Sequence, residues 1–477
     1  MAAFQAVILA AGQGTRMKSS LPKVLHQVAG KAMVDHVVDA ARAAGAANVV
    51  VVVGHEIDRL REHFAGTEVE LVQQEPRLGT GHAVQQAIPR IEAGHGAVVV
   101  LYGDAPLLQA ATLRELVGRH AASDTQLSLL TATVPDAQRL GRIVRGKGGQ
   151  IAIREWADAS DDERACSEVN PGVYCFDRAW LLAELPRLTL SAKGEYYLTE
   201  LVQRARRLQA VHTDAITSHV DIGVDTRQAL AEAEQAMQRR LRAHWMDEGV
   251  TMLDASTVYL DSESCIGRDT VLEANTHIRR SEIGPGCVIG PGSRIERSRI
   301  GARCTIRESV LEEATLEDDV EVGPFSHLRY DTYVERGAKL GNYVEVKNAR
   351  IGRDTQIHHF SYTGDAQVGQ RVNIGAGTIT CNYNSETGAK SETAIEDEVS
   401  TGSHTLLVAP VRLGRGAMTG SGSVVTHDVS AGQLAVGAPA RPRRALRSCT
   451  CGHYRLAHKD GVCVHCGCAN FDLAEAL

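Results

Sequence analysis

The chain has 477 residues, 43% of them hydrophobic, and a formal net charge of −7. Its length predicts roughly three domains, and the mild negative charge argues against nucleic-acid binding. With no apolar run near ~18 residues, we expect no transmembrane helix. The apolar start lacks a basic leader and is interpreted as a first strand. Of 11 cysteines, five lie after residue 448, a distribution that favours a reducing cytoplasm over a disulfide framework.

Residues 1–225 alternate short apolar runs with stretches of helical spacing. Continuous apolar runs at 6–9, 49–53 and 98–102 predict buried parallel strands. Helical spacing lies between them, for example at 31–44 and 112–120. This alternation predicts an α/β domain with a doubly wound, Rossmann-like sheet.

A glycine-rich segment with basic residues follows the first predicted strand. Gly12 and Gly14 let backbone N–H groups approach phosphate oxygens, and Arg16 and Lys23 can neutralise a triphosphate. The third glycine of a dinucleotide fingerprint is missing, and so is the G-K-[ST] of a Walker motif. The alternative is a glycine-rich turn with exposed basic residues.

Asp104 stands at the end of the predicted strand 98–102, where open α/β sheets bind ligands. A carboxylate there is a suitable ligand for Mg²⁺. A lone Asp at a strand end is more often a helix cap, so Asp104 gains weight only from its context.

Residues 226–249 are rich in Ala, Glu, Gln and Arg, and they predict one long linker helix. Within 250–445 a six-residue period, mostly of aliphatic side chains, recurs in several stretches, and it is neither a helical nor an ordinary strand period. It is the period of a parallel β-helix of hexapeptides, whereas a β-sandwich would alternate without a fixed period. The repeats that carry this prediction are Leu316, Val322, Leu328, Val334, Leu340 and Val346, then Ile283, Ile289 and Ile295, and then Ile395, Thr401, Leu407, Leu413, Thr419 and Val425.

The segment 446–477 is rich in Cys and His. Two close pairs of cysteines, about a dozen residues apart, provide enough soft ligands for one tetrahedral Zn²⁺. We predict a small zinc ribbon, with a disordered tail of reduced thiols as the alternative. The preferred ligands are Cys449, Cys451, Cys463 and Cys466, while His453, His458 and Cys468 leave the assignment open.

Both halves of the chain resemble known enzymes. The string at 10–17 with Pro22-Lys23 resembles the sugar-1-phosphate nucleotidyltransferases, and the hexapeptide region resembles the left-handed β-helix acyltransferases. Over residues 5–440 the chain resembles the bacterial bifunctional N-acetylglucosamine-1-phosphate uridylyltransferase/glucosamine-1-phosphate N-acetyltransferase family. In the β-helix this rests on the strings at 328–329, 344–347, 359–365 and 372–383.

For the first half, the resemblance implies binding of UTP, sugar phosphate and Mg²⁺. Asp104 and Asp225 would hold the Mg²⁺, although Asn is common at position 225, and Leu140 stands where Tyr is often found. The implied nucleotide- and sugar-binding residues are Leu9, Ala10, Ala11, Gly12, Gly14, Thr15, Arg16, Lys23, Gln74, Gly79, Thr80, Tyr102, Gly103, Asp104, Gly141, Glu155, Asn170 and Asp225.

For the second half, the resemblance implies acetyl transfer from acetyl-CoA with His359 as the general base, a role for which histidine is a suitable residue type. His358 stands where Gly is usual, and Ala438 where some members have Arg. The implied sugar-phosphate residues are Arg329, Lys347, Tyr362, Asn373, Asn382 and Tyr383, and the implied acetyl-CoA residues are Ala376, Ser403 and Ser421. The loop 384–393 is about two residues longer than usual, and the resemblance implies a homotrimer with acyl sites at subunit interfaces.

The resemblance thus implies a cytoplasmic enzyme that makes UDP-N-acetylglucosamine, a precursor of the cell wall and of lipopolysaccharide. One alternative is a sugar-1-phosphate nucleotidyltransferase of other specificity, with the β-helix as a non-catalytic trimerisation scaffold. A base placed among phosphate-binding residues argues against that alternative, because a scaffold has no need of one.

Overall fold

A computed structural model describes residues 3–54, 57–146 and 150–445, together with 458–459 and 462–463. The chain divides into two units, Met1–Arg239 and Arg240–Leu477, and each is described by itself. Among the described residues, no helix is both long and apolar enough to cross a bilayer.

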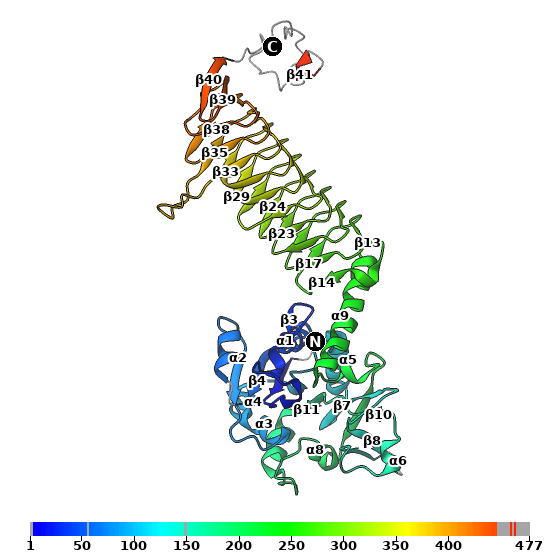
Figure 1. The fold of residues 1–477 in the computed structure, drawn as a ribbon. Helices are drawn as coiled ribbons and strands as arrows, with labels where there is room; N and C mark the ends of the chain where they lie inside the picture. The colour runs from blue at the N-terminus through cyan, green and yellow to red at the C-terminus, as the bar shows by residue number, and fades with distance from the viewer. Residues whose placement is uncertain (1–2, 55–56, 147–149, 446–457, 460–461, 464–477) are drawn as a thin grey trace. The chain divides into compact units, whose positions relative to one another are not determined.

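The first unit is built on a mixed ten-stranded sheet (Figure 1). The three predicted strands are β1, β4 and β6, and β1 pairs in parallel with both of the others. Beyond β6 the sheet continues through antiparallel strands, starting with β11, which the sequence did not predict. The strands are β1 Phe4–Ala10, β4 Ala46–Val53, β5 Glu70–Gln73, β6 Ala97–Tyr102, β7 Leu127–Thr133, β8 Arg142–Arg145, β9 Ile151–Arg154, β10 Glu168–Val169, β11 Tyr174–Phe176 and β12 Leu208–His212, with a separate hairpin of β2 Gln27–Val28 and β3 Lys31–Ala32.

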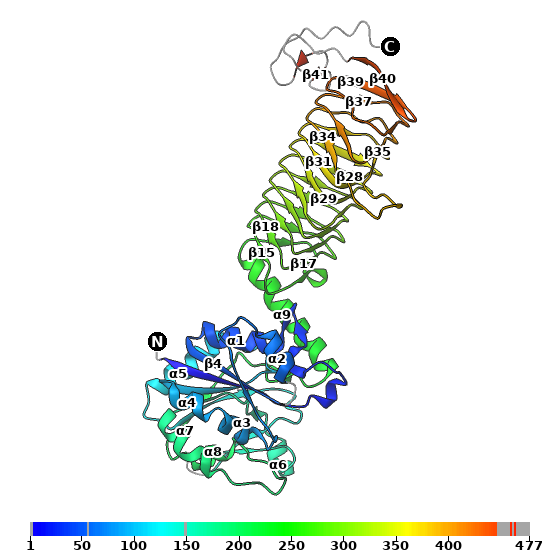
Figure 2. The ribbon, with the colours of Figure 1, turned by 90° about the vertical axis from the view of Figure 1, so that its left-hand side faces the viewer.

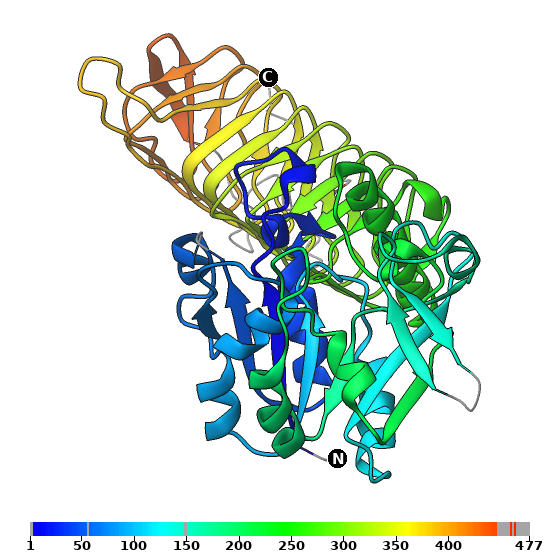
Figure 3. The same ribbon diagram turned by 90° about the horizontal axis from the view of Figure 1, so that it is seen from below.

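Helices cover both faces of this sheet (Figure 3), as a doubly wound fold requires. Alternate residues of β1 point to opposite layers: Ile8 packs in the layer of α1, α2 and α5, and Val7 in the layer of α3, α4, α7 and α8. Both side chains are fully buried. The helices are α1 Met33–Ala43, α2 Ile57–His63, α3 Thr80–Gln86, α4 Ile88–Ala93, α5 Ala110–Ala121, α6 Asp161–Arg164, α7 Arg178–Glu184 and α8 Glu200–Arg204.

The long helix α9 spans Arg227–Asp247, close to the predicted 226–249. Within the first unit, Ala229 and Ala233 pack against Met33 and neighbouring apolar side chains. Within the second unit, Leu241 and Trp245 pack against the start of the β-helix core.

The second unit is a parallel β-helix (Figure 2). Successive coils pair in parallel and in register, so that Val271 lies opposite Val288, and Val288 opposite Thr305. The side chains at the predicted six-residue positions are all buried, from Ile283 at 5% exposure to Leu413 at 0%. The hexapeptide interpretation is therefore confirmed.

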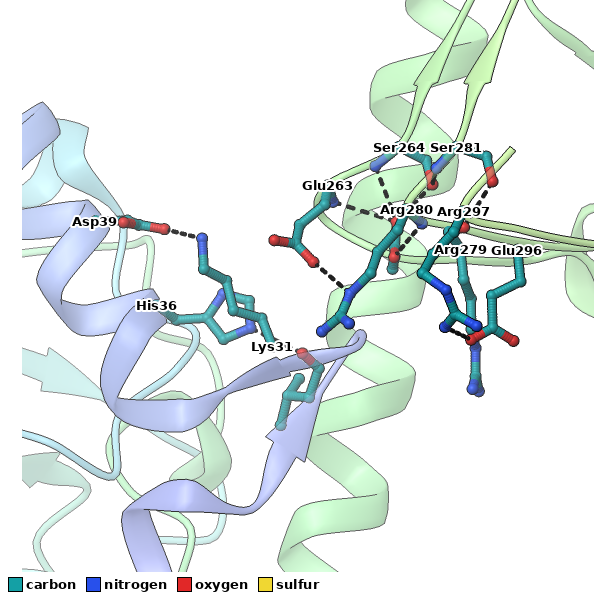
Figure 4. A network of polar contacts seen from close by, with 12 residues as sticks. Lys31, His36, Asp39, Glu263, Ser264, Arg279, Arg280, Ser281, Glu296 and Arg297 are labelled. Atoms are coloured by element: carbon teal, nitrogen blue, oxygen red, sulfur yellow. Dashed lines mark hydrogen bonds and ion pairs between the residues drawn. The ribbon is translucent and has the colours of Figure 1, made fainter. Parts of the chain in front are cut away.

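Polar side chains also connect one coil to the next. Ser281 donates its backbone N–H to Ser264 Oγ over 3.2 Å, and Arg280 Nε donates to Glu263 Oε2 over 3.0 Å (Figure 4). At the corners, glycines leave room for the coil above: a Cβ on Gly352 would lie 2.4 Å from the carbonyl carbon of Gly369. A side chain at Gly352 would therefore collide with the next coil.

The strands that matter for the second site lie in the middle and last coils. They are β26 His327–Leu328, β28 Lys339–Asn342, β29 Glu345–Ile351, β30 Gln356–His359, β31 Tyr362–Val368, β32 Asn373–Ile374, β33 Ile379–Cys381, β34 Thr393–Ile395, β35 Leu406–Val408, β37 Met418–Thr419, β39 Gln433–Gly437 and β40 Ala440–Ala445.

The predicted zinc tail is described only as the backbone of a short antiparallel pair, β41 His458–Lys459 and β42 Val462–Cys463. Cys449, Cys451 and Cys466 lie outside the described residues, and so does the side chain of Cys463. Within the described part of the chain, no group of three or more His, Cys, Asp or Glu side chains could hold a metal ion.

Candidate active sites

In the first unit, Lys23 lies between the two predicted Mg²⁺ ligands. Its ammonium forms an ion pair with Asp104 Oδ2, and a second with Asp225 Oδ1 at 2.8 Å. Arg16 Nη2 lies 2.9 Å from the other oxygen of Asp225. Residues far apart in the sequence are thereby brought to one point at the carboxyl end of β6, as predicted for Asp104.

The electrostatics of this cluster favour charged forms. Burial alone would lower the pKa of Lys23, but the two carboxylates outweigh it and raise that pKa above its ordinary value. Burial would raise the pKa of Asp225, but Lys23 and Arg16 together lower it. Two carboxylates that converge on one cationic group form a donor set that also fits a divalent cation.

Gly14 permits the approach of Lys23 to this cluster. Its φ is +60°, and a Cβ there would lie 2.6 Å from Lys23 Cβ. Gly14 also accepts a backbone hydrogen bond from Met17 N over 2.8 Å, which starts the 3-10 turn Thr15–Met17. Glycine is therefore required at position 14 both for backbone conformation and for space.

A cavity of about 670 Å³ opens beside this cluster. Among the residues predicted from sequence, its walls include Leu9, Ala10, Ala11, Gly12, Lys23, Gln74, Gly79, Thr80, Tyr102, Asp104 and Glu155. Gly14, Thr15, Arg16, Gly103, Gly141, Asn170 and Asp225 are not part of the wall. Sequence reasoning missed Gln13, Val24, Arg77, Ala83, Glu195, Tyr197 and Thr199.

The loop that contains Gly79 is held by its own side chains and by a distant hairpin. Gln74 is buried, and its Nε2 donates to Gly79 O over 2.9 Å. Tyr196 donates its N–H to Leu78 O and accepts from Gly81 N, each over 2.7 Å. The hairpin around Tyr196 therefore forms one wall of the cavity, although its sequence carries no phosphate-binding pattern.

The predicted sugar-facing residues Gly141, Glu155 and Asn170 lie directly beside the ends of the neighbouring strands β8, β9 and β10. Asn170 N donates to Gly141 O over 2.9 Å, and a Cβ on Gly141 would lie 3.7 Å from Glu155 Oε2. Burial raises the pKa of Glu155, and nearby Asp158 adds to this effect while Lys193 opposes it. Of the three residues, Glu155 is the one that faces the cavity.

In the second unit, His359 has one ring nitrogen held from the preceding coil. Its Nδ1 lies 2.6 Å from Asn342 Oδ1, and β28 pairs with β30 so that these two residues are opposite each other. An amide oxygen can only accept, so Nδ1 carries the proton and Nε2 presents its lone pair. His358 instead contacts Gln356 Oε1 over 3.1 Å. Each imidazole therefore has an amide oxygen as partner, but the partner of His359 comes from the preceding coil and that of His358 from its own strand.

The predicted phosphate-binding residues Arg329 and Lys347 lie side by side on adjacent coils. Arg329 N donates to Val346 O over 2.8 Å, which places Arg329 opposite Lys347. Both cations lie near the Tyr330 ring, Lys347 Nζ at 5.1 Å and Arg329 Cζ at 6.0 Å from its centroid. The contact with Tyr330 raises the pKa of Lys347.

Asn382 belongs to a polar network with Asp365, Tyr362 and Asn348. Its Nδ2 donates to Asp365 Oδ2 and, over 3.4 Å, to Tyr362 Oη. Asn348 Nδ2 donates to the other oxygen of Asp365 over 2.6 Å. Tyr383 is 60% exposed at the start of the loop 384–393. The network fixes the Asn382 amide, whereas Tyr383 projects into solvent.

The predicted acetyl-CoA residues continue the column that contains His359. In this column Asn342, His359, Ala376, Ser403 and Ser421 occupy the same position in successive coils. The residue that follows a member donates its backbone N–H to the carbonyl of the member one coil earlier: Phe360 to Asn342 over 3.2 Å, Gly377 to His359 over 3.1 Å, His404 to Ala376 over 2.6 Å and Gly422 to Ser403 over 2.8 Å. Ser421, which precedes Gly422, is the next position. Asn373 lies beside this column, opposite Gln356.

A stripe of glycines runs alongside the same column. Gly341, Gly375, Gly402 and Gly420 precede its members, and a Cβ on Gly402 would lie 2.5 Å from Ser421 N. His358 interrupts this stripe between Gly341 and Gly375. Ala438, the other departure, lies in the turn between β39 and β40 and carries no charge to offer a coenzyme phosphate.

Comparison with known proteins agrees with this two-part organisation. Residues 6–209 match the model of the MobA-like NTP transferase domain. The chain is 46% identical over 437 residues to the bifunctional protein GlmU of Heliobacterium modesticaldum, covering 90% of this chain and 94% of that protein. It is 44% identical over 437 residues to GlmU of Carboxydothermus hydrogenoformans (91% and 97% covered) and 42% identical over 434 residues to GlmU of a Synechococcus species (90% and 96% covered).

Proposed function

The chain belongs to the GlmU family of bifunctional proteins, and from this premise we propose which residues carry each of its two reactions. It is an enzyme that acetylates glucosamine-1-phosphate with acetyl-CoA and then transfers a uridylyl group from UTP to N-acetylglucosamine-1-phosphate. The products are UDP-N-acetylglucosamine, a cell-wall precursor, and pyrophosphate. We assign uridylyl transfer to residues 1–225, acetyl transfer to 250–445 and the connection to the helix 226–249.

For uridylyl transfer, the supporting observation is the convergence of Asp104 and Asp225 on Lys23, with Arg16 paired to Asp225. Asp104 and Asp225 would hold Mg²⁺, which supplies positive charge to the triphosphate when bound. Lys23 and Arg16 stabilise the negative charge that grows on the leaving pyrophosphate as the sugar phosphate attacks the α-phosphorus. The N–H groups at Gly12 and Gly14 approach the phosphates, and Gln74, Gly79 and Thr80 hold the nucleoside.

For acetyl transfer, the supporting observation is the contact between His359 Nδ1 and Asn342. His359 Nε2 takes a proton from the amine of glucosamine-1-phosphate as the amine attacks the thioester carbonyl. The C–S bond then breaks, and the CoA thiolate leaves and is protonated. Arg329 and Lys347 bind the sugar phosphate with help from Tyr362, Asn373, Asn382 and Tyr383, and Ala376, Ser403 and Ser421 contact acetyl-CoA.

We further propose a left-handed coil and a homotrimer in the cytoplasm. An exposed ladder of aromatic rings supports the trimer: Phe325, Tyr343 and Phe360 are 51%, 53% and 63% exposed and stack at 5.4 and 5.2 Å between centroids. Exposed apolar surface of this kind is typical of an interface. Because Phe360 follows His359, a second copy on this ladder would border the acyl site.

We propose that the Cys-rich tail is a zinc ribbon held by Cys449, Cys451, Cys463 and Cys466. The proposal is supported by the ligand pattern alone. Elemental analysis of the purified protein tests this. We expect one zinc per chain, and its absence from a chain truncated after residue 445. A full-length chain without zinc under reducing conditions would contradict the ribbon.

Both reactions can be followed in one assay of the full-length protein. With acetyl-CoA and glucosamine-1-phosphate we expect thiol release with or without UTP, and UDP-sugar and pyrophosphate only when UTP and Mg²⁺ are added. Turnover of added N-acetylglucosamine-1-phosphate without any thiol release would favour the scaffold alternative. Turnover with dTTP but not UTP would favour a pyrophosphorylase of other specificity.

A further inference from the structure

Arg142, the first residue of β8, is a buried cation that has no role among the residues assigned above. It is 2% exposed, and among the residues that the structure describes no carboxylate forms an ion pair with it. A guanidinium in such a place must have its charge and its N–H groups satisfied by other means.

Backbone carbonyls satisfy it. Nη1 donates to Leu140 O and, over 3.2 Å, to Ala137 O, while Nη2 donates to Gln138 O over 3.0 Å. These acceptors belong to the turn that leads into Gly141. One guanidinium therefore holds the whole turn that carries the first predicted sugar-facing residue.

The same guanidinium also contacts the opposite side of the sugar-facing region. Its Cζ lies 5.0 Å from the centroid of Trp156, and its Nε donates to Arg164 O over 3.3 Å. Arg164 covers Trp156 as well, at 5.1 Å, and its Nε donates to Trp156 O over 3.2 Å. Trp156 directly follows Glu155, which faces the cavity, so the contacts of both arginines with the Trp156 ring hold the backbone that carries Glu155.

We propose that Arg142 is a positioning residue that sets the sugar-binding end of the uridylyltransferase site by holding Gly141 and Glu155 in register with each other. It touches neither substrate. It reaches none of the nucleotide-facing contacts around Gly79 or Lys23, so its effect is confined to recognition of the sugar phosphate. The proposal rests on the uridylyltransferase function assigned above.

A neighbouring arginine provides a matched control. Arg145, the last residue of β8, is exposed and binds Glu168 through two hydrogen bonds of 2.9 and 2.6 Å. Arg145→Lys therefore changes the same residue type on the same strand without touching the 137–140 turn or Trp156.

The test is Arg142→Lys in the full-length protein. Lysine keeps the charge but has neither the planar face for Trp156 nor the spread of donors for the carbonyls. We expect KM for N-acetylglucosamine-1-phosphate to rise by about tenfold or more, because small displacements of positioning groups are costly. KM for UTP and the rate of acetyl transfer by the same protein should both stay within about twofold of wild type. Every kinetic parameter of Arg145→Lys should also stay within about twofold.

Two results would overturn the proposal. Unchanged KM for the sugar phosphate would mean that the clamp does not position the site. Equal increases in KM for UTP and for the sugar phosphate, together with loss of UTP binding, would mean that Arg142 supports the fold of the unit and not one subsite. If the wild-type protein had no uridylyl transfer at all, the assigned function would fail instead, which the same assay series reveals before any variant is made.

Discussion

His359 Nδ1 and Asn342 Oδ1 lie 2.6 Å apart across two adjacent coils of the β-helix. Because Asn342 can only accept at this oxygen, the contact selects the tautomer in which Nε2 is free to take a proton. Both residues end their strands at the same corner, so the backbone register maintains the contact.

We expect Asn342→Ala to lower kcat for acetyl transfer by roughly 10- to 100-fold, because the imidazole loses the group that fixes its tautomer and orientation. Uridylyl transfer should be unchanged. Gln356→Ala, which removes the partner of His358, is the matched control and should retain near wild-type acetyl transfer. Equal effects of the two substitutions would contradict an orienting role for Asn342.

The two adjacent histidines are expected to behave differently. His359→Ala should reduce acetyl transfer by about 10²–10⁴-fold because it removes the general base, whereas His358→Ala should leave most of it. Steady-state kinetics with glucosamine-1-phosphate and acetyl-CoA measure both. If His358→Ala were the more damaging change, the base would have to be reassigned.

The β-helix could be predicted from sequence because its signal is local and repeated. Every sixth residue, from Leu316 to Val346, is aliphatic, and each proved to be buried. The register between coils could not be predicted in the same way. Asn342 contacts His359, which lies 17 residues later in the chain, through a strand pairing that the six-residue period alone does not specify.

The candidate sites show the same division. Lys23 and Asp104 were identified from short motifs, but their direct ion pair joins residues 81 positions apart. Arg142 and the hairpin around Tyr196 carry no motif at all. Their importance comes from tertiary contacts to backbone atoms, which any sequence can provide, and so no residue pattern marks them.

Gly14→Ala is expected to damage the first unit. An alanine at φ +60° costs about 1–2 kcal/mol in backbone strain, and its Cβ would lie 2.6 Å from Lys23 Cβ. We therefore expect a lower Tm together with reduced uridylyl transfer, because Lys23 must move away from Asp104 and Asp225.

Gly118→Ala is the control for that substitution. Gly118 lies inside α5 with nothing within 4 Å of an added Cβ, so alanine should be neutral or stabilise the unit by roughly 0.5–1 kcal/mol. Wild-type Tm and uridylyl transfer in Gly14→Ala would show that the turn has another way to accommodate a side chain.

Glu398 is expected to make the stability of the β-helix depend on pH. Its side chain is 1% exposed and accepts from Arg371 Nη2 over 2.9 Å and from Arg415 Nη2 over 3.1 Å. Burial would raise the pKa of Glu398, but the two arginines outweigh it and lower that pKa below its ordinary value of 4.5.

A depressed pKa means that the unfolded chain binds a proton before the folded one does. The stabilisation by Glu398 is therefore complete above pH 4.5 and is lost as the pH falls below 4.5 through the folded pKa. Glu398→Gln should lower the stability by about 2 kcal/mol at pH 7, less than for a fully buried pair because the arginines remain partly hydrated.

Calorimetric Tm values at pH 7 and pH 4 measure this effect, and the gap between wild type and Glu398→Gln should narrow at the lower pH. Glu321→Gln is the control, since Glu321 pairs with Lys339 at 2.8 Å on an exposed surface and should contribute less than about 1 kcal/mol. An equal loss of stability for both variants at pH 7 would contradict the buried Arg371–Glu398–Arg415 bridge as the source of the stabilisation. So would a gap that widens at pH 4, because a carboxylate whose pKa is lowered in the folded state contributes less stability as the pH falls.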